Sequence, residues 1–489
     1  MQSKDNTIKK CGILLALSSL PSKHGIGSLG KEAYDFVDLL AQTGQSYWQI
    51  LPLCPIGKGN SPYSSVASFA GEMLYIDLDT LREKEYIDNI PPCEFSKNTD
   101  FEKSKEFKKP IILDAVLGFD TETREFKSFC KKNEFWLDDY AVFSAIKDVM
   151  GGLPYTQWED GLKYRLPEHL QKFKAKYPQK IEYYKIIQYI FYSQYFKLKK
   201  YANNKGIKII GDIPFYVSGD SADVWANPNC FKLSRDLKPT LIAGVPPDIF
   251  SQNGQLWENP IYDWEYMKTD EYAWWTNRLK HAAEMYDVIR IDHFRAFNDY
   301  YTIPYGSKDA KNGCWVKGVG IEFFDTVMKK IPKCEIIAED LGGESEDVQK
   351  LIKDTGFPNM KILQFAFDSD LEDPFLPQNF GSNCVCYTGT HDNDTTLGWY
   401  EKATVKEKIM FNQLIDADQT NSPVLSLIKA AMESKADTVI IPFQDYLELN
   451  SHSRLNLPGI AFGNWEWRFE KQDITENLKV KISRLSSYR

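Results

Sequence analysis

The sequence predicts a (β/α)₈ barrel, and three observations favour that fold class. About eight short apolar runs recur along the 489 residues, and most of them precede a stretch with helical periodicity. The runs are continuously apolar, which is typical of parallel strands that are buried on both faces. Several runs end in polar residues, which is where barrel folds place functional groups. The candidate strands are Gly12–Ser18, Tyr47–Pro52, Ile207–Asp212, Val288–Asp292, Glu335–Asp340, Met360–Phe365, Cys384–Thr390 and Thr438–Phe443.

The spacing of these runs predicts where the barrel carries insertions. Roughly 150 residues separate the second candidate strand from the third, and one crossover helix cannot fill that length. We therefore expect an inserted, mostly helical subdomain over approximately 72–184 and a smaller insertion over approximately 213–280. About 45 residues follow the last strand, which is too few for a C-terminal β-sandwich. The chain 1–489 is thus expected to be a single barrel domain with insertions.

Charge and cysteine content exclude several classes of function. A formal net charge of −9 would repel nucleic acid and anionic lipid, so we expect neither as a partner. The apolar run Cys11–Leu20 is too short for a membrane helix and lacks a signal-peptide cleavage site. Nine scattered cysteines, with no CxxC pair and no zinc-ligand spacing, favour a reduced, cytoplasmic location. Aromatic residues make up 14% of the chain, and they could stack on sugar rings or simply fill the core.

Three acidic residues stand at or just after the ends of candidate strands: Asp292, Glu339 and Asp392. Arg290 and Asp292 lie two residues apart, so a strand would place them on one face, where the cation favours an ionised carboxylate. A nucleophile requires that charge state. Apolar residues precede Glu339 and should raise the pKa of its carboxyl group, which suits a general acid.

Each pattern alone also has a structural interpretation. Arg290 and Asp292 could form an ion pair that closes a layer of the barrel, and Glu339 could cap a helix or face solvent. The acidic run around Asp392 could hold calcium, although it lacks the glycine and distal glutamate of an EF-hand loop. Three such patterns at the strand ends of one barrel favour catalysis, and paired carboxylates are what glycosidic cleavage requires. We expect no metal and no cofactor.

Over nearly its whole length the chain resembles 4-α-glucanotransferases of the amylomaltase, or disproportionating-enzyme, type within the α-amylase clan. The resemblance rests on the three acidic segments and on many short motifs that occur in order. These motifs include Ser18–Ser22, Trp48–Leu53, Ser61–Ser65, Gly211–Pro214, Asp223–Trp225, Pro246–Asp248, Gly254–Trp257, Arg454–Gly459 and Asn464–Trp465.

The resemblance implies a role for each candidate site residue. Asp292 is expected to be the nucleophile, Glu339 the acid/base, and Asp392 the residue that distorts and holds the reacting sugar. Phe250 and Trp257 match a loop of the smaller insertion that arches over the cleft and guides acceptors. The positions expected to bind the sugar at the cleavage point are Tyr63, Asp212, Arg290, His293, His391 and Asn464.

The expected activity is transfer of α-1,4-glucan segments, with retention, between maltooligosaccharides or from dextrin to glucose. Two departures from the family pattern, Ile249 in place of an aromatic residue and Glu258 in place of a glycine, affect the expected acceptor preference and cyclic products. A hydrolase with the same residues and a catalytically silent glucan-binding protein are the alternatives. The sequence leaves the physiological donor and the oligomeric state open.

Overall fold

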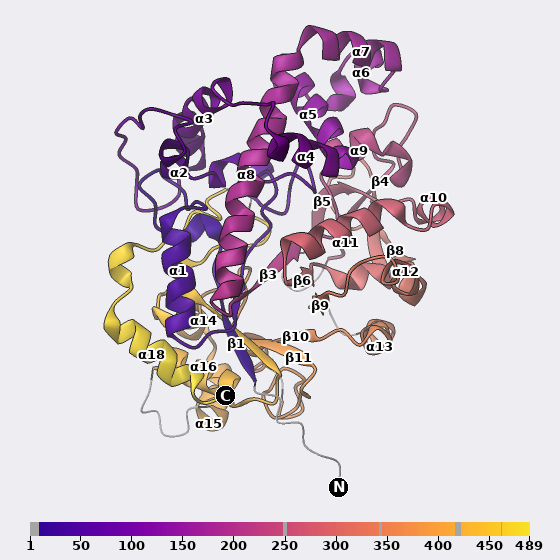
Figure 1. The fold of residues 1–489 in the computed structure, drawn as a ribbon. Coiled ribbons are helices and arrows are strands. Elements are labelled where there is room, and N and C mark those ends of the chain that lie inside the picture. The colour runs from indigo at the N-terminus through magenta and orange to yellow at the C-terminus, as the bar shows by residue number, and fades with distance from the viewer. Residues whose placement is uncertain (1–8, 248–251, 342–344, 369, 416–421, 461) are drawn as a thin grey trace.

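Eight parallel strands close into a barrel, as the sequence predicts (Figure 1). The computed structural model describes the chain except residues 1–8, 248–251, 342–344, 369, 416–421 and 461. Around the barrel the order is β1-β12-β11-β10-β9-β6-β3-β2. Each strand falls within or beside one of the predicted apolar runs. The strands are β1 (Lys10–Leu14), β2 (Tyr47–Gln49), β3 (Lys208–Ile213), β6 (Val288–Ile291), β9 (Glu335–Ala338), β10 (Asn359–Ile362), β11 (Cys384–Tyr387) and β12 (Thr438–Pro442).

Alternate residues of these strands fill the inside of the barrel. In β11, Val385 and Tyr387 belong to the inner apolar cluster, whereas Cys384 and Cys386 belong to the outer core. This alternation is the period of two that a strand imposes on its side chains. Other strands contribute to the same inner cluster, whose further members are Leu14, Tyr47, Ile210, Val288, Ile337, Met360, Ile362 and Ile440.

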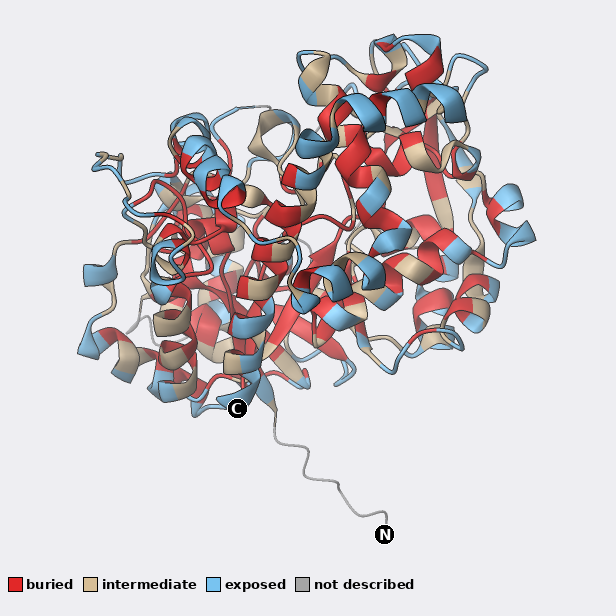
Figure 2. Cartoon of the chain, turned by 45° about the horizontal axis from the view of Figure 1, so that its top comes forward, coloured by how far each residue is buried: buried red, intermediate tan, exposed pale blue. Residues whose placement is uncertain are grey.

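Helices cover the outside of the barrel and turn their apolar faces inward. In α1 (Lys31–Gln42) the buried residues Ala33, Phe36, Val37 and Leu40 recur at helical spacing. Figure 2 shows the same pattern throughout, with buried residues on the inner sides of helices and exposed residues on the outer sides. The other covering helices include α11 (Ala273–Met285), α12 (Gly320–Val327), α13 (Glu346–Thr355), α16 (Pro423–Glu433) and α18 (Glu476–Ser486).

The connection between β2 and β3 is helical over much of its length and stands above the barrel, away from the two chain ends (Figure 1). Its last helix, α8 (Pro178–Asn204), packs against α1 and leads back to β3. The expected limit at residue 184 falls inside α8, so it does not coincide with the end of an element. The preceding helices are α2 (Leu78–Glu83), α3 (Phe101–Leu117), α4 (Arg124–Lys132), α5 (Glu134–Val149), α6 (Asp160–Lys163) and α7 (Pro167–Lys176).

A four-stranded antiparallel sheet that the sequence analysis did not anticipate lies beside the barrel. Its order is β5-β4-β7-β8. The central pair β4 and β7 joins the β3–β6 connection to the β6–β9 connection, so the pairing is not visible in either segment alone. The strands are β4 (Leu241–Val245), β5 (Gln255–Pro260), β7 (Asp299–Pro304) and β8 (Cys314–Lys317).

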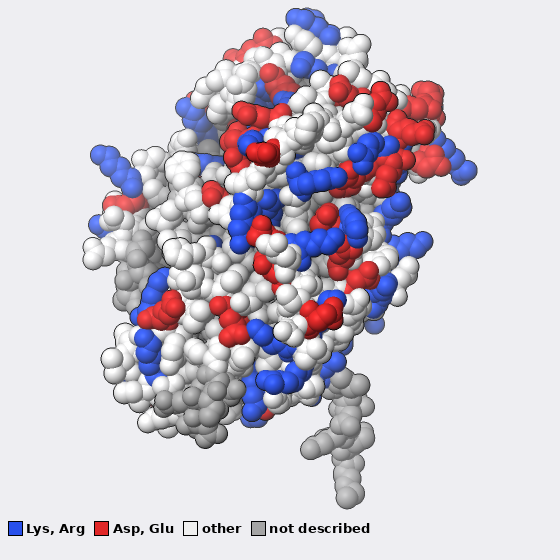
Figure 3. Space-filling view, turned by 90° about the vertical axis from the view of Figure 1, so that its left-hand side faces the viewer, with Lys and Arg blue, Asp and Glu red and all other residues white. Residues whose placement is uncertain are grey.

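No strand follows β12 among the described residues, in agreement with the expected lack of a C-terminal sandwich. All nine cysteines carry free thiols. None of the described helices is long and apolar enough to cross a membrane. On the face drawn in Figure 3, basic and acidic side chains are interspersed over most of the surface.

Candidate active site

The centre of the candidate site is the buried guanidinium of Arg290. Arg290 on β6 is the direct partner of Asp212 on β3 in the strand register. Its Nη1 lies 2.7 Å from both carboxylate oxygens of Asp212 and 3.0 Å from Oδ1 of Asp292. The side chains of Arg290 and Asp212 are 3% and 0% exposed, whereas that of Asp292 is 28% exposed. The guanidinium therefore pairs with a fully buried carboxylate, Asp212, and also with a partly exposed one, Asp292.

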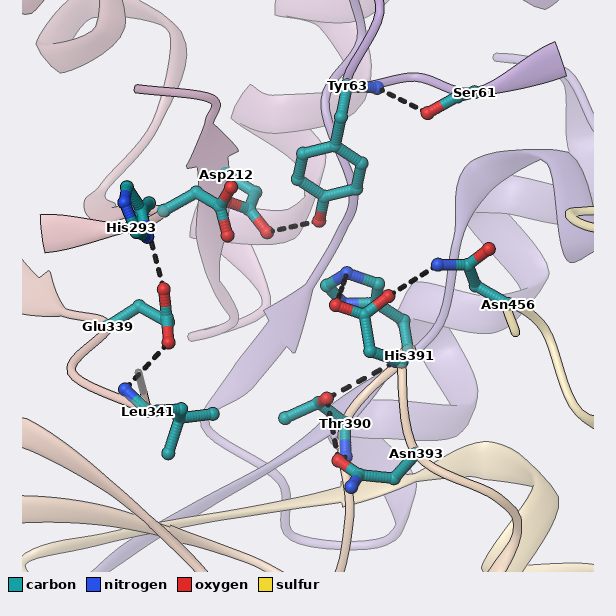
Figure 4. Close-up of polar contacts among 12 residues, drawn as sticks. Ser61, Tyr63, Asp212, His293, Glu339, Leu341, Thr390, His391, Asn393 and Asn456 are labelled. Atoms are coloured by element: carbon teal, nitrogen blue, oxygen red, sulfur yellow. Dashed lines mark hydrogen bonds and ion pairs between the residues drawn. The ribbon is translucent and has the colours of Figure 1, made fainter. Parts of the chain in front are cut away.

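Tyr63 extends this network from the loop that follows β2. Its hydroxyl donates to Oδ2 of Asp212 at 2.7 Å (Figure 4). The ring stacks on His391, with centroids 5.1 Å apart and an angle of 15° between planes, and also lies 5.9 Å from Trp465. Burial and the neighbouring Asp212 raise the pKa of Tyr63 well above its usual value, so the phenol stays protonated. These contacts fix an aromatic surface beside the carboxylates, as a sugar-stacking site requires.

Backbone amides hold the carboxylate of Glu339, which follows β9. His293 N–H donates to Oε2 at 2.6 Å and Leu341 N–H donates to Oε1 at 2.8 Å (Figure 4). His293 adopts a left-handed conformation with φ of 50°, which is uncommon for a residue other than glycine and is often found at functional sites. Burial raises the pKa of Glu339, with Arg290 and the two amides opposing it. The predicted direction of this shift is confirmed.

The expectation that Arg290 keeps the pKa of Asp292 low is wrong. Burial raises the pKa of Asp292 well above its usual value, and the nearby carboxylates of Asp212, Glu339 and Asp392 add to that effect. Arg290 opposes the shift, but Asp212 already occupies this guanidinium with two contacts. One cation therefore serves two carboxylates. Because Glu339 is one of the groups that raise the pKa of Asp292, the ionisation of one carboxyl group affects the other.

Asp392 and His391 lie in the loop between β11 and α14 (Thr396–Lys402). The carboxylate of Asp392 is 46% exposed, and its Oδ2 lies 3.4 Å from His391 Nε2. Burial lowers the pKa of His391, so its imidazole is neutral near pH 7. The loop is fixed at both ends by buried Asp445, which accepts hydrogen bonds from the Thr388 hydroxyl at 2.6 Å and from Thr396 N–H at 2.8 Å.

Two residues that the sequence analysis gave no role also hold Asp392. The Asn456 side-chain amide donates to Oδ1 at 2.6 Å, and Arg454 Nη2 donates to the Asp392 carbonyl at 2.5 Å. Both belong to a motif that the resemblance singled out. Asn464, in contrast, uses its amide within its own loop, with contacts to the backbone of Leu457 and Ile460 at 2.9 and 2.8 Å. In the structure Asn464 makes loop-closing contacts, and its expected role in binding the sugar stays a prediction.

The loop that carries Phe250 and Trp257 is described only in part. Phe250 and Ile249 lie outside the described residues. Trp257 on β5 meets the edge of His293, with ring centroids 4.9 Å apart and planes at 85°, which places it next to the residue that holds Glu339. Burial lowers the pKa of His293 to about 4, so this imidazole is neutral.

Glu258, which replaces a common glycine, has φ of 62°, a left-handed conformation that glycine adopts without strain. Its exposed carboxylate pairs with Lys58 across the site at 3.0 Å. Exposed pairs of this kind contribute little to stability.

The arrangement suits acid/base and nucleophilic chemistry on a neutral, hydroxyl-rich ligand. It combines two coupled carboxyl groups with a third carboxylate that faces the opening. Neutral imidazoles, a phenol and aromatic faces surround them. Among the described residues, no group of three or more His, Cys, Asp or Glu side chains could hold a metal ion.

We expect Asp292→Asn to raise Tm near neutral pH. A carboxyl group with a raised folded-state pKa binds more protons in the folded than in the unfolded protein. Its cost to stability therefore grows as pH rises from the unfolded pKa, about 3.9, through the folded value. Asparagine keeps an acceptor for Arg290 and removes that cost, so the gain should vanish at acid pH. Melting curves across pH test this, with exposed Asp325→Asn as the control. A lower Tm for Asp292→Asn near neutral pH would contradict the assignment.

Comparison with known proteins agrees with this geometry. A family model described as 4-alpha-glucanotransferase matches residues 15–474. The chain is 42% identical over 485 residues to a 4-alpha-glucanotransferase of Clostridium butyricum, covering 96% of this chain and 98% of that protein. It is 41% identical over 491 residues to one of Streptococcus pneumoniae, covering 98% and 97%.

Among solved structures, the amylomaltase from Streptococcus agalactiae in complex with acarbose has a TM-score of 0.95 at 39% identity, covering 98% of this chain and 99% of that one. An amylomaltase from Corynebacterium glutamicum shares the fold, with a TM-score of 0.76 at 16% identity, covering 98% of this chain and 75% of that one. The chain belongs to the 4-alpha-glucanotransferase family.

Proposed function

We propose that Asp292, Glu339 and Asp392 carry out the reaction of this family, which transfers α-1,4-glucan segments with retention of anomeric configuration. The observation that supports this assignment best is the shared guanidinium. Arg290 contacts Asp292 directly at 3.0 Å, whereas the donors on Glu339 are neutral backbone amides. Burial raises the pKa of both carboxyl groups in the ligand-free protein. We assign the reactive state in which Asp292 is ionised and Glu339 is protonated, because Asp292 contacts a full cation whereas the donors on Glu339 are neutral amides.

In the first step a carboxylate oxygen of Asp292 attacks the anomeric carbon of the donor sugar. The bond from that carbon to the glycosidic oxygen breaks, and the Glu339 proton moves to the departing oxygen. In the second step Glu339, now ionised, takes the proton of an acceptor hydroxyl. The hydroxyl oxygen attacks the anomeric carbon and releases Asp292. Two inversions give net retention.

Asp392 and the aromatic surface would act on the donor sugar. The half-exposed carboxylate of Asp392 is placed to accept hydroxyl hydrogen bonds that strengthen as the ring flattens. Tyr63, stacked on His391, supplies an aromatic face, and Trp257 and Phe250 are assigned to the acceptor side. Maltooligosaccharides and dextrin are the proposed donors and glucose the simplest acceptor. A cytoplasmic location remains part of the proposal.

Transfer must compete with hydrolysis, because water can also resolve the glycosyl-enzyme. An acceptor sugar prevails only if the site holds its hydroxyl near attack distance, where effective molarities can reach about 10⁵ M or more. Trp257 sits against the residue that holds Glu339, so a bound acceptor there would lie close to the base and displace water.

We expect Glu339→Gln, given a glycosyl fluoride donor, to accumulate a covalent glycosyl adduct on Asp292. Fluoride leaves without a proton, so the first step survives, whereas the second step lacks its base. Peptide mass mapping should place the adduct on Asp292, and the double variant Asp292→Asn/Glu339→Gln should carry none. Asp292→Asn alone should lower turnover of natural donors by at least about 10³-fold. An adduct on any other residue rules out Asp292 as the nucleophile.

With maltotriose as sole substrate, we expect glucose and a ladder of longer maltooligosaccharides while total reducing ends stay nearly constant. Exchange of one α-1,4 bond for another preserves the number of chains. Trp257→Ala combined with Phe250→Ala should shift the balance toward hydrolysis. Trp315→Ala, an exposed tryptophan on β8 of the same sheet, is the matched control. If the unaltered protein raises reducing ends in step with maltotriose loss, it acts as a hydrolase.

A further inference from the structure

The segment from Arg454 to Trp465 lies along the loop that carries His391 and Asp392. Asn456 N–H donates to the His391 carbonyl at 3.2 Å, and the Asn456 side chain donates to Asp392 Oδ1 at 2.6 Å. Arg454 spans the two segments, with Nη2 on the Asp392 carbonyl at 2.5 Å and Nε on the Asn456 carbonyl at 2.7 Å. In Figure 4 a dashed line joins the Asn456 amide to the carboxylate drawn beside His391, which is that of Asp392. Three of these hydrogen bonds join residues more than 60 positions apart in sequence.

Hydrogen bonds also connect the described residues at the two ends of the Arg454–Trp465 segment, in which residue 461 is not described. Trp465 N–H donates to the Leu455 carbonyl at 2.6 Å across the base of the loop. The Asn464 side chain accepts from Leu457 N–H at 2.9 Å and donates to the Ile460 carbonyl at 2.8 Å. Trp465 also packs 5.9 Å from the His391 ring. The base of the loop therefore presents Asn456 to Asp392 in one orientation.

The partners of the Asp392 carboxylate are uncharged. Oδ1 accepts from the amide of Asn456, and Oδ2 faces the neutral imidazole of His391 at 3.4 Å. The guanidinium of Arg454 binds the backbone carbonyl of Asp392 instead of its carboxylate. A cation at Oδ1 would neutralise the negative charge with which Asp392 would accept hydrogen bonds from the sugar hydroxyls. A neutral amide orients the carboxylate and leaves its charge available.

We propose that Asn456 is a positioning residue that sets the orientation of Asp392 toward the reacting sugar, with Arg454 fixing the backbone beneath it. The proposal rests on the role proposed above for Asp392. Without the amide, the half-exposed carboxylate can rotate away from its contact geometry. A displacement of about 1 Å at a group that contacts the transition state can lower the rate by about 10²-fold.

Asn456→Asp provides a titratable version of this contact at the same size. Two facing carboxyl groups 2.6 Å apart cannot both ionise, so they share one proton at acid pH and repel each other when that proton leaves. The charged and titratable groups around the pair include His391, Tyr63, Arg454, Asp394 and Asp292. We expect kcat/KM of Asn456→Asp relative to the unaltered protein to be low at alkaline pH and to rise at least about 10-fold at acid pH.

Asn450→Asp is the matched control. Asn450 caps the short helix just before the segment by accepting from His452 N–H at 3.2 Å, a contact that a carboxylate retains. Its activity ratio should stay near one at every pH. A flat ratio for Asn456→Asp, or activity equal to the unaltered protein throughout, overturns the proposal. The maltotriose assay of the unaltered protein separates this outcome from a failure of the proposed function, because transfer would still be observed.

If melting curves show that Asn456→Asp does not fold, a double-mutant cycle of Asn456→Ala and Asp392→Asn tests the positioning role instead. Asn456→Ala should lower kcat/KM by about 10- to 100-fold in the native background. In the Asp392→Asn background the same change should cost nothing further, because Asn456 acts through that carboxylate. Additive losses would show that Asn456 acts independently of Asp392 and would refute the positioning role.

Discussion

The site depends on one buried cation that two carboxylates share. Arg290 is 3% exposed and contacts Asp212 twice and Asp292 once. Loss of Asp212 from its fully buried pair with Arg290 would cost about 3–5 kcal/mol, because a charge would remain uncompensated, whereas Asp292 lies at the opening. The same contact gives the site its chemistry. Arg290 Nη1 is shared between Asp212 and Asp292, and burial together with the nearby carboxylates raises the pKa of Asp292 in spite of that contact.

The barrel topology brings this network together. Asp212 and Arg290 are register partners on adjacent strands, so their contact follows from the pairing of β3 with β6. The groups around them come from loops at the same end of the barrel: Tyr63 after β2, His391 after β11, and Asn456 after β12. Because parallel strands all end on one face, residues hundreds of positions apart in sequence become neighbours. The inserted helices and the antiparallel sheet then build walls around that face.

Sequence patterns predicted the barrel because each buried parallel strand is a continuous apolar run, and all eight runs became strands. The pairing of Arg290 with Asp292 followed from spacing alone, since both lie within one strand end. The sharing of Arg290 with Asp212 did not, because it depends on the register between two strands. The pKa of Asp292 was predicted in the wrong direction because burial, which the spacing does not reveal, outweighs the effect of Arg290.

Other features escaped prediction because they join distant segments. The sheet β5-β4-β7-β8 combines two barrel connections, and neither has a strand pattern that specifies its partner. The contact of Asn456 with Asp392 spans 64 positions, and a lone asparagine in a loop carries no signal of it. The loop-closing contacts of the Asn464 amide were also not visible in the sequence. Sequence motifs located the important segments but did not show what each side chain touches.

The titration of Asp292 and Glu339 is the most direct test of this account, because burial raises the pKa of both carboxyl groups. Infrared spectroscopy of the ligand-free protein across pH detects the C=O stretch of protonated carboxyl groups. We expect a band that persists well above the pH at which exposed carboxyl groups ionise, and that shifts to lower pH in both Asp292→Asn and Glu339→Gln, because each change removes the repulsion between the pair. A spectrum in which both carboxyl groups ionise at ordinary acidic pH, unaffected by either variant, would contradict the account.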